Sequence, residues 1–244
     1  MISERPATLQ PRRSLMPDSA SDSPSGAASG SSVGLSPACE SSLDAIVAHV
    51  QRHIGPIAYV WHEQASTIVH VDVHVVFPTE ERPFYTLVTS GMSDLPMTLP
   101  QEVEMPPYAE LLIRLPAEWN LDYETLNDER NYWPIRLLQS LARFPHATQG
   151  WLDLGLALPN GLPPRPFAPD THLCAAMTAF PYVEGEAFHV LEARPGKTIR
   201  FFAVMPLHAS EMQFLREQGP EELEKRFEQA ETSLILDPQR PPAV

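Results

Sequence analysis

Cysteine and basic residues are scarce in this sequence, and each shortage excludes a class of protein. The two cysteines, Cys39 and Cys174, lie far apart and no CxxC pair occurs, so neither a disulfide framework nor a structural zinc site is expected. Lys and Arg number 17 against 31 Asp and Glu, for a formal net charge of −14. Because nucleic-acid binding depends on Lys and Arg at the phosphates, we expect no nucleic-acid partner.

Long apolar stretches are missing as well. No segment approaches the roughly 18 consecutive apolar residues that span a bilayer. The N-terminus also lacks the apolar core of a secretory signal peptide. The sequence therefore predicts a cytoplasmic protein with no membrane partner.

The motifs that most often carry phosphate binding or hydrolysis do not occur. GxGxxG, GxxxxGK[ST] and HExxH are absent, and no GxSxG occurs in the globular part of the sequence, residues 41–230. Ser90 and Ser93 lie in a Gly-containing turn, but nothing in the sequence places a histidine base beside either hydroxyl. A turn held by side-chain hydrogen bonds to the backbone is the simpler interpretation. We therefore expect no catalytic residue and no cofactor.

Composition divides the chain into three parts. Residues 1–40 are rich in Ser, Pro, Gly and Ala and have few large apolar side chains, which predicts a disordered tail. The globular pattern extends over residues 41–230, and we expect residues 231–244, which end in DPQRPPAV, to be loose.

Apolar residues recur at helical spacing in four segments of the globular part. Asp128 or Asn131 is expected to cap the second of these helices. Ser210 and Gln213 have the spacing of a capping box for the third. The segments are residues 41–55, 132–144, 210–219 and 220–229.

Short strand-like runs, separated by turn residues, fill most of the remainder. Strands in runs, helices at the margins and no regular βαβ alternation predict an α+β fold with a mostly antiparallel β-sheet and a single domain. The expected strands are residues 57–63, 67–77, 83–90, 108–116, 150–158, 172–180, 186–194 and 198–206.

One of these strands raises a question about metal binding. In TIVHVDVHVVF, residues 67–77, the valines point to one face while His70, Asp72 and His74 share the other. Three potential ligands on one face suit a metal ion, yet a sheet that is solvated on one side also places polar residues there. The spacing fits both interpretations, and we favour the scaffold strand because chance alone predicts one His-X-acid pair in this composition.

The metal interpretation has a definite form. His70 and Asp72, with His189 as a distant third ligand, match the facial triad of non-haem iron oxygenases. Arg200 lies where an arginine that binds 2-oxoglutarate often follows in such enzymes. The enzymatic alternative is therefore an Fe(II)-dependent oxygenase.

Four longer blocks of sequence carry a more specific signal. In order they are FPTEERPFYTLVTSGMSDLPM, YAELLIRLP, YWPIRLLQSLARFPH and IRFFAVMPLHASEMQFLREQGPEELEKRF. They resemble the Suppressor of fused-like domain family, in its free-standing bacterial form, over nearly the whole globular part. In animal members the corresponding domain is one half of a two-domain regulator that clamps a transcription-factor peptide by β-strand addition. This chain ends where the second half would begin, so we do not expect that clamp.

The resemblance implies a single-domain protein-interaction module without enzymatic activity. Its bacterial members imply an immunity protein that binds and neutralises a toxin, and the animal members imply the alternative of a regulator that sequesters a transcription factor. An acidic surface suits a basic toxin, because opposite charges speed association. The expected recognition residues are Ser90, Gly91, Met92, Ser93, Asp94, Leu95 and Met97, with His70, Asp72 and His74 nearby.

Overall fold

The computed structural model describes residues 42–66, 68–125 and 127–244. The predicted disordered tail, residues 1–40, lies outside the described residues. Cys174 is a buried free thiol. Among the described helices, none combines the length and the apolar character that crossing a membrane requires.

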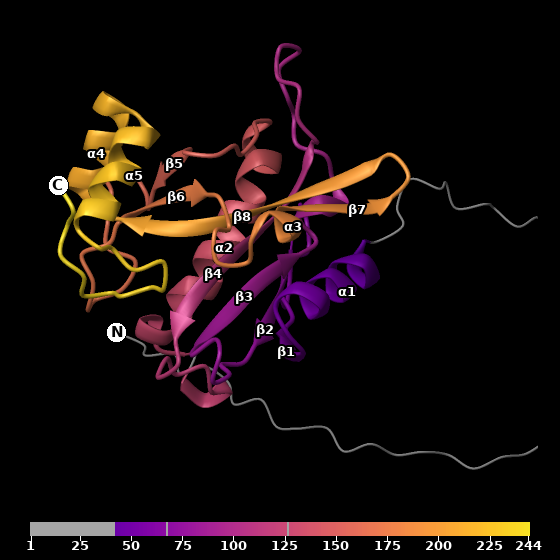
Figure 1. Ribbon diagram of the computed structural model, residues 1–244, viewed down its shortest axis with the longest axis horizontal. Coiled ribbons are helices and arrows are strands. Elements are labelled where there is room, and N and C mark those ends of the chain that lie inside the picture. The colour runs from indigo at the N-terminus through magenta and orange to yellow at the C-terminus, as the bar shows by residue number, and fades with distance from the viewer. Residues whose placement is uncertain (1–41, 67, 126) are drawn as a thin grey trace, which may run out of the picture. The chain divides into compact units, whose positions relative to one another are not determined.

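A mixed eight-stranded sheet forms the centre of the described part of the chain (Figure 1). The strand order is β1-β2-β3-β4-β8-β6-β5, and β7 pairs with β8 off this path. Only the β4–β8 pairing is parallel among these neighbours. The mostly antiparallel α+β fold is thereby confirmed. The strands are β1 (Ile57–Trp61), β2 (Asp72–Val76), β3 (Phe84–Ser90), β4 (Tyr108–Pro116), β5 (Ala157–Pro159), β6 (Ala175–Ala179), β7 (Val190–Arg194) and β8 (Lys197–Leu207).

Helices cover both faces of the sheet. On β4, Leu111 and Ile113 pack into the core that includes Trp133 of α2, whereas Leu112 packs with Ile46 of α1. A strand buried on both faces reads as a nearly continuous apolar run, as YAELLIRLP does apart from Glu110 and Arg114. The helices are α1 (Leu43–His53), α2 (Glu129–Thr148), α3 (Glu186–His189), α4 (Ala209–Gln218) and α5 (Pro220–Gln229), with 3₁₀ turns η2 (Met92–Asp94) and η3 (Tyr123–Thr125).

Most predicted strands are shorter in the structure than in the sequence pattern; residues 67–77, for example, contribute only β2, which leaves His70 outside the strand. Residues 150–158 contribute only the start of β5 (Ala157–Pro159), because Gly155 adopts a φ of +76° and interrupts the extended chain. Residues 186–194 begin with the single turn of α3, which buries Phe188 completely, before β7 starts.

Two helix starts also differ from the prediction. Asp128 caps α2 by accepting a hydrogen bond from Arg130 N, which confirms one of the two expected caps, and the helix begins before residue 132. The capping box of α4 is formed by His208 and Glu211, so the prediction of Ser210 and Gln213 is wrong. Glu211 is at position N3, three residues after His208, so its carboxylate accepts a hydrogen bond from the His208 amide at 2.8 Å.

The C-terminal segment differs from the expected loose tail. Leu236 is buried, and its amide donates to Arg114 O on β4 at 2.9 Å. Arg240 is buried too and pairs with Glu211, at 2.5 Å between Nη1 and Oε1. This ion pair joins the end of the chain to the start of α4.

The Glu211–Arg240 pair predicts a pH-dependent loss of stability. Burial would raise the pKa of Glu211, but hydrogen bonds from Arg240 and the Ala243 amide hold that pKa below its ordinary value. The pair therefore stabilises the fold above the pKa of the unfolded chain, about 4.3, and this contribution is lost as the pH falls through the folded pKa. We expect Arg240→Ala to lower the free energy of unfolding by about 3–5 kcal/mol at pH 7, because it leaves a buried carboxylate unpaired.

Urea unfolding of both proteins at pH 7 and near pH 3 measures this effect. The deficit of the variant should shrink at the lower pH, where Glu211 takes up a proton. Arg130→Ala, which removes an exposed ion pair with Asp128, is the matched control and should change stability little. A deficit of the same size at both pH values would contradict the assignment.

Candidate functional site

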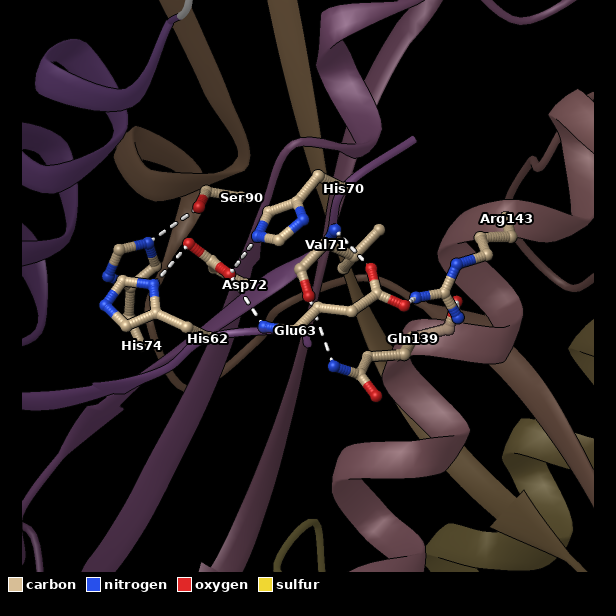
Figure 2. Close-up of polar contacts among 9 residues, drawn as sticks. All are labelled: His62, Glu63, His70, Val71, Asp72, His74, Ser90, Gln139 and Arg143. Carbon is tan, nitrogen blue, oxygen red and sulfur yellow. Dashed lines mark hydrogen bonds and ion pairs between the residues drawn. The ribbon is translucent and has the colours of Figure 1, made fainter. Parts of the chain in front are cut away.

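A polar cluster surrounds the start of β2 (Figure 2). Asp72 contacts two imidazoles, His62 Nδ1 at 2.8 Å and His70 Nε2 at 2.9 Å, one with each carboxylate oxygen. Its Oδ1 also accepts a hydrogen bond from the Glu63 amide at 3.1 Å. The carboxylate of Asp72 is therefore surrounded by donors from its own chain.

Glu63 and Gln139 connect this cluster to α2 (Figure 2). Glu63 accepts a hydrogen bond from the Val71 amide at 3.0 Å and pairs with Arg143 of α2. Gln139, also on α2, donates to Val71 O at 3.2 Å. The sequence prediction missed His62, Glu63, Gln139 and Arg143, although WHE at the end of β1 shows two titratable side chains at a strand end.

The structure does not assemble the ligand set of an iron oxygenase. His70 and Asp72 meet, but His189 contacts Phe201 O through Nδ1 at 3.0 Å and packs against the ring of Phe180. Within the residues that the structure describes, no group of three or more His, Cys, Asp or Glu side chains is arranged to hold a metal ion. Arg200 lies over the ring of Phe202.

His74 and Ser90 form a pair that the sequence did not predict. His74 Nε2 lies 2.8 Å from Ser90 Oγ, so a histidine does stand beside one of the two turn serines. The residues are only 2% and 5% exposed, and burial lowers the pKa of His74. His74 Nδ1 has no hydrogen-bond partner in the described chain, and Asp72 bonds to other histidines. The pair therefore lacks both the orienting carboxylate and the solvent access of a hydrolytic triad.

The face that carries these residues is only partly solvated. His70 is half exposed and Asp72 partly buried, but His74 is enclosed in the fold. The same face of the sheet is covered farther along by α1 and α3, whose apolar residues pack with Val76 and Val88. The polar pattern of β2 thus reflects internal hydrogen bonding as well as exposure.

A buried carboxylate, Glu110 of β4, organises the segment that follows β3. Its Oε1 accepts hydrogen bonds from the Gly91 amide at 3.0 Å, the Ser93 amide at 3.0 Å and the Ser93 hydroxyl at 2.7 Å. Its Oε2 accepts from the Thr89 hydroxyl at 2.6 Å. Sequence reasoning missed Glu110, for which the only signal was a single carboxylate within an apolar strand.

Gly91 occupies a position that only glycine tolerates. Its φ is +105°, and a Cβ there would lie 1.8 Å from His70 O. The turn after β3 therefore passes directly over the backbone that precedes β2. This close approach places the predicted loop beside His70.

The predicted recognition segment divides into a buried and an exposed part. Met92, Ser93 and Met97 are buried, as is Ser90, so these side chains support the segment from inside. Asp94 and Leu95 are exposed, Leu95 to 44%. Of the residues expected at the surface, the structure leaves His70, Asp94 and Leu95 most accessible to a partner.

We expect Gly91→Ala to lower the free energy of unfolding by more than about 3 kcal/mol, because the new methyl group clashes with backbone that cannot move independently. Gly196→Ala is the matched control, since Gly196 also has a positive φ, +81°, but has nothing within 4 Å of a Cβ. The control should lose only about 1–2 kcal/mol, the cost of the left-handed conformation. Equal losses in chemical denaturation would contradict the close approach to His70.

Replacement of Glu110 tests the buried carboxylate. Burial raises the pKa of Glu110, against the opposing effect of hydrogen bonds from Thr89 and Ser93. The folded state therefore holds this proton more tightly than the unfolded state, and stability falls as the pH rises from about 4.3 towards the folded pKa. We expect Glu110→Gln to remove that part of the pH dependence in urea unfolding between pH 4 and pH 8.

Glu110→Ala serves as the comparison for Glu110→Gln. It removes the acceptor of two backbone amides and two hydroxyls, which should cost about 3 kcal/mol or more. An unchanged pH dependence in Glu110→Gln would show that Glu110 does not titrate differently in the folded chain.

The sequence profile of the Suppressor of fused protein (SUFU) family matches residues 68–241. No curated protein matches the chain. Solved structures share its fold, among them three whose identities to this chain are too low to show more than the fold. A SUFU homologue from Neisseria gonorrhoeae has a TM-score of 0.61 at 20% identity, over 82% of this chain and 96% of that one.

Two further structures superpose on most of this chain. One is from the Sufu–Fu complex, with a TM-score of 0.59 at 12% identity over 83% of this chain and 92% of that chain. The other is Drosophila Suppressor of Fused, with a TM-score of 0.53 at 13% identity over 79% of this chain and 47% of that chain. Because the family profile covers well over half of the sequence, the chain belongs to the Suppressor of fused protein family.

Proposed function

We propose that this chain is a non-catalytic protein-interaction domain of bacterial, immunity type, which binds and neutralises a partner protein in the cytoplasm. The observation that carries the proposal is membership of the SUFU family over residues 68–241. One solved structure of this fold comes from a complex of Sufu with Fu, which supports protein binding as the use of the fold.

The arrangement of polar groups supports a binding role. Asp72 and Glu110 are each engaged by donors from their own chain, and Ser90 and His74 are enclosed. These groups stiffen the segment after β3, so that Asp94 and Leu95 are displayed from a fixed base. A rigid segment with an apolar and a charged side chain suits recognition of a protein.

The net charge supports a basic partner. At −14, the chain would attract a positively charged protein over long range and speed its association at low salt. A regulator that sequesters a basic transcription factor would share this chemistry, so the identity of the partner distinguishes it from an immunity protein.

Capture of the partner from the host, followed by reconstitution with both purified proteins, tests the proposal. We expect Leu95→Asp to weaken the reconstituted complex at least tenfold, because a carboxylate replaces an apolar contact at the surface. Leu162→Asp is the matched control, because Leu162 is 88% exposed in a different loop, and it should leave the affinity unchanged. Isothermal titration calorimetry gives the dissociation constants.

Co-expression then tests the immunity role. If the captured partner is a toxin, the wild-type chain should restore growth and the Leu95→Asp variant should not. A partner that stops growth whether or not the chain is bound would overturn the immunity role. Equal affinities of Leu95→Asp and the wild type would overturn the assigned surface.

A further inference from the structure

A groove of about 360 Å³ lies between α5 and the paired strands β6 and β8. Figure 1 shows α4 and α5 together at the end of β8, which leads directly into α4. The volume of the groove is near the lower end of the range for ligand pockets, so the groove can hold a few side chains but not the surface of a folded domain. We call this feature the α5 groove.

Small and flexible apolar side chains form the floor of the α5 groove. Met177 on β6 is directly opposite Met205 on β8, and Ala179 is opposite Ala203. Residues two apart on a strand share a face, so these four side chains line one surface. Alanines leave space above the sheet, and methionines adapt to the shape of an apolar group.

Carboxylates line the opposite wall of the α5 groove. Glu224 and Glu228 lie one turn apart on α5, with Phe227 between them, and Glu231 follows the helix. Tyr182, more than half exposed, stands across the groove. The apolar floor is therefore bordered by negative charge along one side.

The basic residues nearest this wall are engaged elsewhere. Lys225 pairs with Glu222 at 2.6 Å, and Arg226 lies over the ring of Phe214, 5.5 Å from its centroid. Arg114, the basic residue that lines the groove, pairs with Glu184. No ion pair of Glu224, Glu228 or Glu231 occurs within the described part of the chain.

The carboxylates also affect one another. Partial burial raises the pKa of Glu224, and the charges of Glu228 and Glu221 raise it further. The pKa of the Tyr182 hydroxyl is raised by burial and by Glu224 and Glu228, which places all three groups within electrostatic reach. A cation between them would relieve this repulsion.

We propose that the α5 groove binds a short segment of a partner protein that presents large apolar side chains flanked by Lys or Arg. The apolar side chains would cover the floor of Met177, Met205 and the two alanines. The cationic groups would meet Glu224 and Glu228, which form no ion pair with any of the described residues. The inference takes the protein-binding role as given but concerns a surface separate from Asp94 and Leu95.

The probe is a fluorescein-labelled octapeptide with two central Leu, flanked on both sides by Lys, and a second peptide with Glu in place of each Lys. In anisotropy titrations the Lys peptide should bind saturably and the Glu peptide should not. The double variant Glu224→Gln/Glu228→Gln should weaken binding at least tenfold. Glu80→Gln/Glu81→Gln changes the net charge equally at the exposed loop between β2 and β3, and it should change the affinity less than twofold.

Methyl NMR locates the bound peptide. With ¹³C-labelled methionine methyl groups, the Lys peptide should shift the resonances of Met177 and Met205, which line the groove. Absence of saturable binding, equal weakening in both double variants, or shifts that spare these two methionines would each overturn the inference.

The two proposals fail separately. If the Lys peptide does not bind while Leu95→Asp still releases the captured partner, the α5 groove inference falls and the proposed function stands. If the peptide binds as expected but Leu95→Asp has no effect on the partner, the assignment of the first surface falls and the groove remains.

Discussion

The centre of this fold depends on the hydrogen bonds that the buried carboxylate of Glu110 accepts. Glu110 is fully buried on β4, the strand that joins the antiparallel β1–β4 part of the sheet to β8. A buried carboxylate is tolerated only when its oxygens are satisfied, and Glu110 accepts from Thr89, Gly91 and Ser93. The course of the chain after β3 follows from that requirement.

The hydrogen bonds to Glu110 also constrain the segments around it. To donate to Glu110, the backbone at Gly91 adopts a positive φ and passes over His70 O, which leaves no room for a side chain. The same approach sets the start of β2, where Asp72 orders His62 and His70. A buried carboxyl group inside the sheet thus determines the shape of a surface segment that lies 17 residues away in the sequence.

Other buried charges secure the parts that the sheet does not hold. Glu184 pairs with Arg82 and Arg114 and so fixes the segment before α3 against β3 and β4. Glu211 and Arg240 hold the C-terminal segment. In each case, removal of one partner leaves the other unpaired in the interior, so substitution of either residue should destabilise the fold. Among the described residues, Glu224 and Glu228 of α5 have no ion-pair partner of this kind.

Local spacing in the sequence was enough to determine much of the architecture. The apolar periodicity gave the α+β class and the approximate positions of most strands, and Asp128 was recognisable as a cap because a helix start depends on neighbours within a few residues. The four ordered blocks were enough to identify the family. These features can be recognised from the sequence because the interactions behind them join residues that are close together in the sequence.

Only the tertiary structure decided which polar groups are buried and hydrogen-bonded inside the molecule. Ser93 meets Glu110 across 17 residues, His74 meets Ser90 across 16, and Arg240 meets Glu211 across 29. The predicted recognition segment therefore proved to be half buried, and the predicted loose tail proved to be packed. Whether a polar side chain is exposed or enclosed depends on partners that folding brings from distant parts of the chain, and spacing along the sequence does not specify them.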